Sequence, residues 1–580
     1  MNREFFLYDN LVCLTNSKSD LELIQELVDK NIQQNTLLCL LDHRLYSLKS
    51  KNIIKNKIDI LDLDYLMFSI KPSIISFIKK NFQIEDLRYF KKYINFYFLL
   101  LVAQKYSIKN AVIFSDYEIN FKIIFDWINN RILKNLKIKK EQKFFFSIFK
   151  YSDYLCIKNN IKIISLKNKK KFSILEKEQI NKKEENLFWV GFDKNITNIN
   201  WNKKYKKDYW YKYKNKNTKY GEPLFKNLKY CSRCCLPETS EGMDFDNFGI
   251  CTFCRNSEQK MVIDWNKRGE ILKSILKKNK SINYYDALLP ISGGKDSMYQ
   301  AHVLKLHNIH SLAVTHGQNW LSLTGRYNLN NLLIQFDLDH LIFVASRRKI
   351  NRVAKKSLYE IGDSCWHCHI GAGTFSIQTA IFWKLNLLIY GEGPGDTDAR
   401  GSHERIIDPD IFMFLKESAL KKAQEFEEKN DNKNYLSSWK YPSLKDSKKL
   451  KMISLGNYIF WDEHKNIDFV INHYNWMNSK VENTYKGYKS NECIMAGVHD
   501  YLNFLKRGIG RATIHASEDV RRGLITRSEG FELAKEHDIK RPHALNYYKK
   551  ITGFKEDNIK KIIKKSSKSS KFAKKFFKVR

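Results

Sequence analysis

The feature that most constrains this chain is a glycine-containing loop, Ser292–Ser297, between a predicted strand and a predicted helix. The apolar run Tyr284–Ile291 is typical of a buried strand, and Met298–His307 has a helical pattern. At such a junction, backbone N–H groups beside paired glycines approach an anion closely, and the helix N-terminus adds partial positive charge. The loop is not of the Walker A type, because an aspartate replaces the Ser or Thr that follows the lysine. The sequence therefore predicts an α/β domain that cradles a polyphosphate with Ser292, Gly293, Gly294, Lys295, Asp296 and Ser297.

Three later apolar runs extend this pattern into a parallel sheet. They are Leu312–Thr315, His340–Val344 and Leu387–Tyr390. Ligands of such sheets lie beyond the carboxyl ends of the strands. His316, Gly391 and Glu392 follow two of these runs directly, so we expect them to contact adenosine or the acceptor substrate.

Residues 1–220 predict an additional α/β domain, because short apolar runs alternate there with helical patterns. The runs are Leu37–Leu41, Ala111–Phe114 and Ile161–Leu166. No glycine-rich turn follows them, so a structural extension is favoured over a partner-docking or degenerate sugar-binding domain. A boundary is expected in the Lys-, Asn-, Tyr- and Trp-rich stretch near 195–229. The expected segments after it are a cysteine module (228–260), the phosphate-loop domain (261–450), a substrate-recognition segment (451–555) and a basic tail (556–580).

Two C-x-x-C pairs lie immediately before the phosphate-loop domain. Cys231 and Cys234 are separated from Cys251 and Cys254 by the spacing of a four-thiolate zinc site. Four thiolates close the coordination sphere, so we expect a structural zinc ion rather than a catalytic one. Cys235 stands beside Cys234 and is an alternative fourth ligand.

A third pair, Cys365 and Cys368, falls inside the phosphate-loop domain. With Cys493 it would form a three-thiolate iron–sulfur site, and with His367 or His369 a second metal site. Buried reduced thiols that bind no metal are an equal alternative. Six of the eleven cysteines fall in C-x-x-C pairs, which favours a reducing, cytoplasmic compartment over disulfides.

The segment after residue 450 combines aromatic, charged and glycine residues in a way that suits anion or sugar recognition. Trp461, Asp462, Lys506 and Arg511 are the candidate substrate contacts, the last two for the diphosphate of a nucleotide sugar. His499 and Asp500 are candidates for acid or base roles beside Lys295 and Asp296 of the loop. Each of these groups is also common on an ordinary surface. Ser528 is the expected N-cap of a helix over Glu529–Glu536.

The formal net charge is +38, but the lysines are spread among Asn- and Ile-rich segments, as compositional bias would produce. A nucleic-acid partner is therefore not expected, and the cluster in Lys560–Arg580 is interpreted as a solvated end. Met1–Asp9 contains charges before any apolar segment develops, which argues against a secretory signal. Tyr93–Ala103 has about half the residues needed to cross a bilayer. It is interpreted as a buried helix, and no membrane span is expected.

The loop Ser292–Ser297 in its strand–loop–helix setting resembles the PP-loop of the ATP pyrophosphatase superfamily, whose members cleave ATP between the α and β phosphates. This resemblance implies that Ser292, Gly293, Gly294 and Ser297 bind pyrophosphate and that Asp296 contacts Mg²⁺. The cysteine pairs, this loop, Gly391–Glu392, Trp461–Asp462 and the runs His499–Thr513 and Asp519–Arg527 together resemble the N-acetyl sugar amidotransferases, over about residues 228–545. Residues 1–220 lie outside that family's pattern.

The resemblance implies that an acetamido group of a sugar becomes an acetamidino group, for surface polysaccharide, lipopolysaccharide or flagellin glycans. The implied cofactors are ATP, Mg²⁺ and Zn²⁺, and the implied partner is a glutaminase subunit of the histidine-biosynthesis type that supplies ammonia. Two alternatives remain open at this point. They are a tRNA-thiolating PP-loop enzyme with an iron–sulfur cluster and a noncatalytic scaffold.

Overall fold

The computed structural model describes residues 221–280, 284–317, 320–397, 402–408, 439, 442 and 449–566, together with six strands among the first 172 residues. Three expectations fall outside this part of the chain: the helix at Tyr93–Ala103, the start of the boundary at 195–220, and the tail beyond residue 566.

The six N-terminal strands form one sheet in the order β3-β2-β1-β4-β5-β6. All neighbouring strands are parallel except β5 and β6. Their bounds are β1 Asn10–Thr15, β2 Asn35–Leu40, β3 Ile58–Asp62, β4 Asn110–Phe114, β5 Lys162–Ser165 and β6 Lys171–Phe172. β2, β4 and β5 overlap the three apolar runs singled out in the sequence, and this parallel sheet fits the predicted α/β class.

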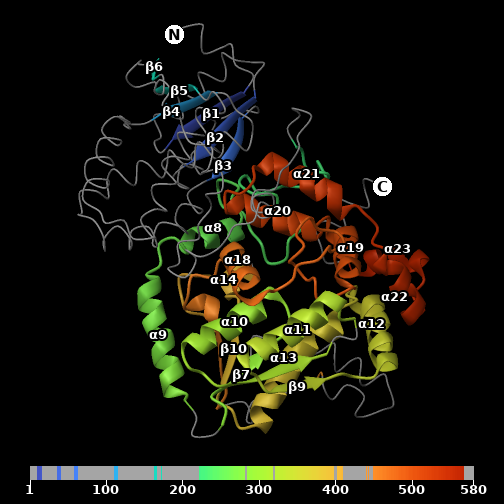
Figure 1. The fold of residues 1–580 in the computed structure, drawn as a ribbon. Helices are drawn as coiled ribbons and strands as arrows, with labels where there is room; N and C mark the ends of the chain where they lie inside the picture. The colour runs from blue at the N-terminus through green and yellow to red at the C-terminus, as the bar shows by residue number, and fades with distance from the viewer. Residues whose placement is uncertain are drawn as a thin grey trace, which may run out of the picture.

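The second sheet has five parallel strands in the order β11-β10-β7-β8-β9 (Figure 1). Its strands are β7 Ala287–Pro290, β8 Ser311–His316, β9 His340–Phe343, β10 Leu387–Tyr390 and β11 Lys451–Ser454. β7 and β10 lie side by side although they are not consecutive in the chain, so the sheet order reverses between them. Parallel sheets with such a reversal bind ligands outside the carboxyl ends of the strands at this point. The predicted α/β fold is confirmed here as a Rossmann-like sheet.

Both faces of this sheet are buried, as a parallel sheet requires. Leu289 of β7 packs in one core with α10 (Lys295–Leu306), α11 (Leu323–Phe336) and α18 (Glu463–Tyr474). The next residue, Leu288, points to the opposite face and packs with Ile377 and Ala380 of α13. The sheet therefore holds the loop after β7 rigidly between two cores.

A helical layer lies beside the sheet and carries the C-terminal part of the chain (Figure 1). Its members are α19 (Ala496–Arg507), α20 (Arg511–Arg521), α21 (Arg527–Asp538), α22 (Ala544–Thr552) and α23 (Ile559–Ser566), and the layer packs against α12 (Arg347–Ile361) and α13 (Trp366–Phe382). Trp366, Leu502 and Tyr548 share one core of this layer. The cysteine module, with α8 (Thr252–Gln259), packs its own core against Ala516, Val520 and Phe531 of α20 and α21. The C-terminal helices thus join the cysteine module to the sheet domain.

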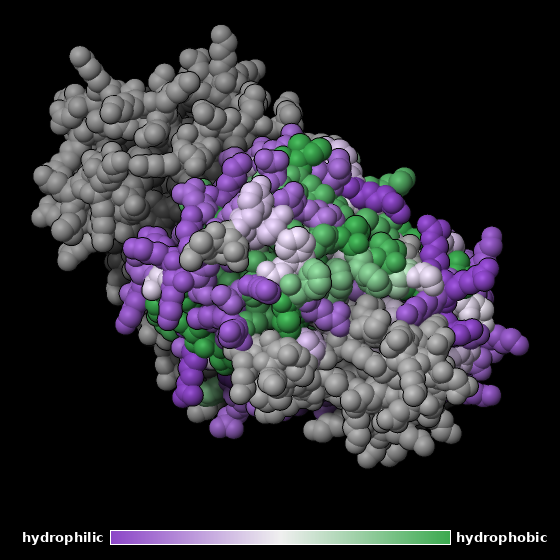
Figure 2. Space-filling view, turned by 90° about the horizontal axis from the view of Figure 1, so that it is seen from below, coloured by the Kyte–Doolittle hydropathy of each residue, from purple (hydrophilic) through white to green (hydrophobic). Residues whose placement is uncertain are grey.

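Four short or peripheral elements complete the described fold: α9 (Trp265–Lys278), α14 (Pro394–Thr397) after β10, and the 3-10 turns η7 (Leu455–Asn457) and η8 (Glu556–Asn558). On the face drawn in Figure 2, hydrophobic residues gather in a central band with hydrophilic residues around it. Within the described residues, no helix is both long enough and apolar enough to span a bilayer.

Candidate functional site

The loop after β7 is shaped by its own hydroxyls and by one tryptophan. The Ser292 amide donates to Ser297 Oγ (3.1 Å), and the Gly294 amide donates to Ser292 Oγ (3.3 Å). Trp476 Nε1 donates to the Gly293 carbonyl (3.0 Å) and fixes the turn from outside. Helix α10 begins at Lys295, earlier than the predicted Met298, because Gly294 is its extended N-cap. The loop therefore sits on a helix N-terminus, whose partial positive charge favours an anion.

Only glycine fits at position 293 in this turn. Its φ of +83° lies in the left-handed region, and a Cβ there would come within 2.7 Å of the Gly325 carbonyl oxygen. The requirement for glycine follows from both the backbone conformation and the close approach of α11.

A cavity of about 910 Å³, here called cavity A, opens at the carboxyl edge of the sheet beside this loop. Residues that follow β7, β8 and β10 line it, as the sheet reversal predicts. Of the candidate contacts, it brings together Ser292, Asp296, Ser297, His316, Gly391 and Glu392. This volume is at the upper end of the range for cofactor-sized sites.

Lys295 does not line cavity A but lies buried behind it. Its Nζ is 2.9 Å from Glu463 Oε1 and also contacts Asp296 Oδ2. Glu463, on α18, further pairs with Arg522 (3.1 Å) and contacts Lys489. Although burial opposes the charge, Lys295 and Lys489 hold the pKa of Glu463 well below its ordinary value. A single buried carboxylate therefore gathers three cations beside the loop.

Two carboxylates, Asp296 of the loop and Glu392 after β10, line the same cavity. Burial, with a further contribution from the charge of Asp296, raises the pKa of Glu392 to about 7. Asp296 Oδ1 is buried and has no hydrogen-bond partner. Paired carboxylate oxygens of this kind are ligands that Mg²⁺ takes in phosphate sites. The arrangement fits a divalent cation, which would supply the missing partner.

His316 forms another wall of cavity A. Both of its ring nitrogens are buried without hydrogen-bond partners, and burial lowers its pKa to about 4. Gly371 on α13 makes room for the ring, since a Cβ at this glycine would lie 2.3 Å from His316 Cε1. The imidazole is therefore neutral at pH 7 and offers one donor and one acceptor.

A second cavity of about 440 Å³, here called cavity B, adjoins the first, and Glu392 and Thr397 line both. It lies between the cysteine module, which contributes Phe253 and Ser257, and the C-terminal helices. Its wall carries four cations and five carboxylates: Lys489, Arg507, Arg521 and Arg522, with Glu241, Glu392, Asp396, Glu463 and Glu518. Arginine forks of this kind match the oxygens of phosphate groups. The pair of cavities would hold two ligands in contact at Glu392.

Among the candidate substrate contacts, Trp461 alone lines a cavity, and that cavity is B. Asp462 is the N-cap of α18 and accepts from the amides of His464 (3.0 Å) and Lys465 (3.2 Å). Lys506 Nζ donates to the Gly362 carbonyl (2.5 Å) and closes the end of α12. The spacing of residues in the sequence does not distinguish a side chain that caps a helix, as Asp462 and Lys506 do, from one that contacts a ligand.

His499, Asp500 and Arg511 contact one another and line neither cavity. Arg511 Nη2 donates to Asp500 Oδ1 (3.0 Å), and that oxygen lies 3.1 Å from His499 Nδ1. The acid or base roles of His499 and Asp500 stay a prediction from the sequence.

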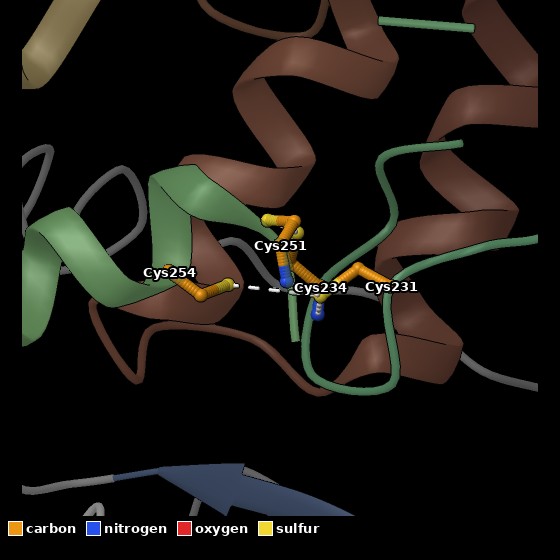
Figure 3. Close-up of side chains that lie close together, drawn as sticks. All are labelled: Cys231, Cys234, Cys251 and Cys254. Carbon is orange, nitrogen blue, oxygen red and sulfur yellow. Dashed lines mark hydrogen bonds between the residues drawn. The ribbon is translucent and has the colours of Figure 1, made fainter. Parts of the chain in front are cut away.

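The four cysteines of the first two pairs converge on one point (Figure 3). Cys231 Sγ lies 3.9 Å from Cys254 Sγ, and Cys234 Sγ lies 3.7 Å from Cys251 Sγ. Sulfurs about 2.3 Å from a tetrahedral ion stand about 3.8 Å apart. Backbone amides of Arg233 and Cys251 donate to Cys231 Sγ at 3.3 Å, as in a thiolate knuckle. The cluster would hold a metal ion and is compatible with zinc.

Cys235 lies outside this cluster. Its Sγ points to the Arg527 carbonyl (3.5 Å) on α21, and Gly530 leaves the space for it. Arg527 also donates to the carbonyls of Cys231 (2.7 Å) and Cys234 (3.1 Å). Of the two alternatives for the fourth ligand, the geometry brings Cys234 into the cluster.

Cys365, Cys368 and Cys493 do not form a cluster of this kind. Among the described residues, the groups whose donor atoms all lie within 4.8 Å of one another are the four cysteines and a set of Asp363, His369 and His499. Burial raises the pKa of Cys365 well above its ordinary value and that of Cys368 above it. Both thiols are therefore held in the neutral form, with Cys365 buried and Cys368 half-buried.

Several residues of the site were not singled out from the sequence. Glu463, Lys489 and Arg522 come together from three distant segments, so no local pattern marks them. Asp363 lies two positions before Cys365, and its proximity to His499 on α19 appears only in the folded structure.

The sheet order and cavity A define the class, a Rossmann-like α/β domain with a ligand cavity at its carboxyl edge. Residues 482–580 match the family model for the C-terminal domain of WbpG-like lipopolysaccharide (LPS) biosynthesis proteins. This match points to a part in LPS or sugar biosynthesis. No curated protein gives a significant match to the chain.

Proposed function

We propose that this protein is an ATP-dependent amidotransferase that converts the acetamido group of an N-acetyl sugar into an acetamidino group, forming AMP and pyrophosphate. One observation carries the proposal: cavity A beside Ser292–Ser297 meets cavity B, which is lined by charged side chains, at Glu392. Eight of the nineteen residues that line cavity B lie within 482–580, the segment similar to LPS biosynthesis proteins. A nucleotide site and a sugar site side by side are what this reaction needs.

ATP would lie in cavity A with its phosphates on the loop. The amides of the loop and the N-terminus of α10 would bind the β and γ phosphates, and His316 would contact the adenosine. Lys295 would turn from Glu463 toward a phosphate oxygen, while Lys489 and Arg522 keep the glutamate paired. Asp296 and Glu392 would hold Mg²⁺, which neutralises charge on the phosphates.

The acceptor would lie in cavity B. Arg507 and Arg521 would bind the diphosphate of a nucleotide sugar, and Trp461 would pack against a ring. This orientation places the acetamido group toward Glu392, at the wall shared with ATP. Positioning of the two reactants accounts for most of the rate gain expected of such a site.

The reaction would proceed in two balanced steps. The acetamido oxygen attacks the α-phosphorus, the bond from that phosphorus to the bridging oxygen breaks, and pyrophosphate leaves with the electron pair. Ammonia then attacks the carbon of the protonated O-adenylyl imidate, one proton is lost, and AMP leaves with the former amide oxygen to give an amidinium ion. Ammonia would come from a separate glutaminase subunit of the histidine-biosynthesis type.

The test is product analysis with purified full-length protein, Mg²⁺-ATP, ammonium and a panel of nucleotide-linked N-acetyl sugars. We expect AMP, pyrophosphate and amidine in equal amounts. Asp296→Asn should abolish all three, whereas the matched control Asp337→Asn, at the exposed C-cap of α11, should not. Formation of ADP and phosphate, or of a thiolated nucleoside in tRNA, would overturn the proposal.

A further inference from the structure

A second cluster of metal-ligand side chains lies apart from the four cysteines. Asp363 precedes α13, His369 is in the first turns of that helix, and His499 is on α19. One donor atom from each lies within 4.8 Å of the others. Two imidazoles and a carboxylate are a donor set found in protein sites for zinc and related divalent metals.

The orientation of His499 is set by a chain of contacts behind it. Arg511 Nη1 donates to Ser490 Oγ (2.6 Å), and Arg511 holds Asp500 through two nitrogens. Asp500 Oδ1 in turn accepts from His499 Nδ1 (3.1 Å). A histidine that ligates a metal commonly donates its other ring N–H to a carboxylate in this way, which fixes the tautomer.

The remaining nitrogen, His499 Nε2, faces Asp363 Oδ1 at 3.8 Å. This distance is too long for a hydrogen bond, which an imidazolium and a carboxylate in contact would form. Two ligands about 2.1 Å from a tetrahedral ion stand about 3.4 Å apart. The separation is thus closer to that of two ligands of one ion than to that of a bonded ion pair.

The backbone holds the same oxygen of Asp363. Oδ1 accepts from the Cys365 amide (2.7 Å) at the start of α13. The carboxylate is therefore positioned by the backbone and does not need His499 for its orientation.

We propose that Asp363, His369 and His499 bind a divalent transition-metal ion of the zinc class, with Asp500 and Arg511 as positioning residues. The site does not depend on the proposed amidotransferase activity. Three protein ligands leave one position for water or another ligand, unlike the closed cysteine site. His369 also lines cavity A, so the ion would lie at its wall.

Metal analysis of the purified full-length protein tests this assignment. After dialysis against free Zn²⁺ and removal of excess, the wild type should hold two zinc ions per chain. His369→Ala, at an exposed side chain, should hold one, and His543→Ala, an exposed histidine outside both clusters, should hold two. Asp500→Asn should weaken the second site by about 10-fold to 100-fold while the first stays filled.

The circular dichroism spectrum of each variant checks that it is folded. His499→Ala, which removes another ligand, should also hold one zinc ion. If this variant fails to fold, the metal content of His369→Ala and Asp500→Asn still tests the assignment. One zinc ion per wild-type chain, or two in folded His369→Ala, would overturn the assignment.

Discussion

The ammonium nitrogen of Lys295 lies 2.9 Å from Glu463 Oε1, which joins the first residue of α10 to the first residue of α18. Both side chains are almost fully buried, at 4% and 2% exposed. A buried ion pair is stable only while both partners are present. Glu463 therefore holds the Lys295 ammonium group beside the loop. The same carboxylate also pairs with Lys489 and Arg522.

Replacing this carboxylate should be costly. Glu463→Gln leaves the buried Lys295 and the partly buried Lys489 and Arg522 without their shared partner, and we expect a loss of about 3–5 kcal/mol in the free energy of unfolding. Pyrophosphate should restore part of that loss by supplying negative charge. Denaturant titration with and without pyrophosphate measures both effects. Glu536→Gln, at a side chain 57% exposed, is the control and should change stability little. Equal stability of the two variants would contradict this role of Glu463.

Substitution by alanine should have opposite effects on stability at two glycines. Gly269 lies inside α9, and a Cβ at this position would meet no other atom within 4 Å, so Gly269→Ala should stabilise the protein by about 0.5–1 kcal/mol. Gly371→Ala should destabilise it and weaken nucleotide binding, because the new Cβ would displace His316 from cavity A. Thermal unfolding and ATP titration separate the two outcomes. Unchanged ATP affinity in Gly371→Ala would argue against His316 as an adenosine contact.

The geometry of the cysteine cluster predicts that Cys234, and not Cys235, binds the metal ion. Cys234→Ser should lose one bound zinc ion and lower the unfolding temperature, because the cluster shares a core with α20 and α21. Cys235→Ser should keep the metal, since a serine hydroxyl still reaches the Arg527 carbonyl. Zinc analysis of both variants is the measurement. Loss of zinc from Cys235→Ser alone would reverse the ligand assignment.

The protein should lose stability in acid partly through His316. Burial lowers the pKa of this residue from 6.5 to about 4, so the unfolded chain binds more protons than the folded chain between these values. Its contribution is complete above pH 6.5 and is lost as the pH falls toward 4, by at most about 1.4 kcal/mol per pH unit. Unfolding free energies at pH 7 and pH 5 should differ less in His316→Asn than in the wild type. Equal differences in the two proteins would contradict the shift.

The sequence predicted the strands of the central sheet better than the residues that surround its site. β7, β8 and β10 coincide with apolar runs, because strands buried on both faces are apolar throughout, and the half-exposed edge strand β9 also coincides with one. β11 was missed, since Lys451–Ser454 is short and begins with a lysine. This strand pairs with β10 and lies at the very start of the segment assigned to substrate recognition.

The N-terminus of α21 carries a capping pattern that the sequence analysis overlooked. Ser528 was the predicted N-cap of α21, and this was wrong: Thr526 caps the helix. Thr526 and Glu529 form a capping box, a T-x-x-E pattern that is visible in the sequence. The Ser528 hydroxyl instead accepts from the Gly221 amide (2.9 Å).

No such local sequence pattern marks the cations that line cavity B. Lys506 and Arg507 are adjacent on α19, yet Lys506 caps α12 while Arg507 lines the cavity. Which of two neighbouring cations faces a ligand depends on how α19 packs, and that packing is set by contacts between segments far apart in the chain.

The central claim is that the acetamido oxygen attacks the α-phosphorus of ATP in cavity A. The most direct measurement uses a nucleotide-linked N-acetyl sugar with a heavy oxygen isotope in its acetamido group, followed by mass spectrometry of the products. We predict that the label appears in AMP and is absent from pyrophosphate. Label in pyrophosphate or phosphate, or unlabelled AMP formed together with amidine, would contradict the claim.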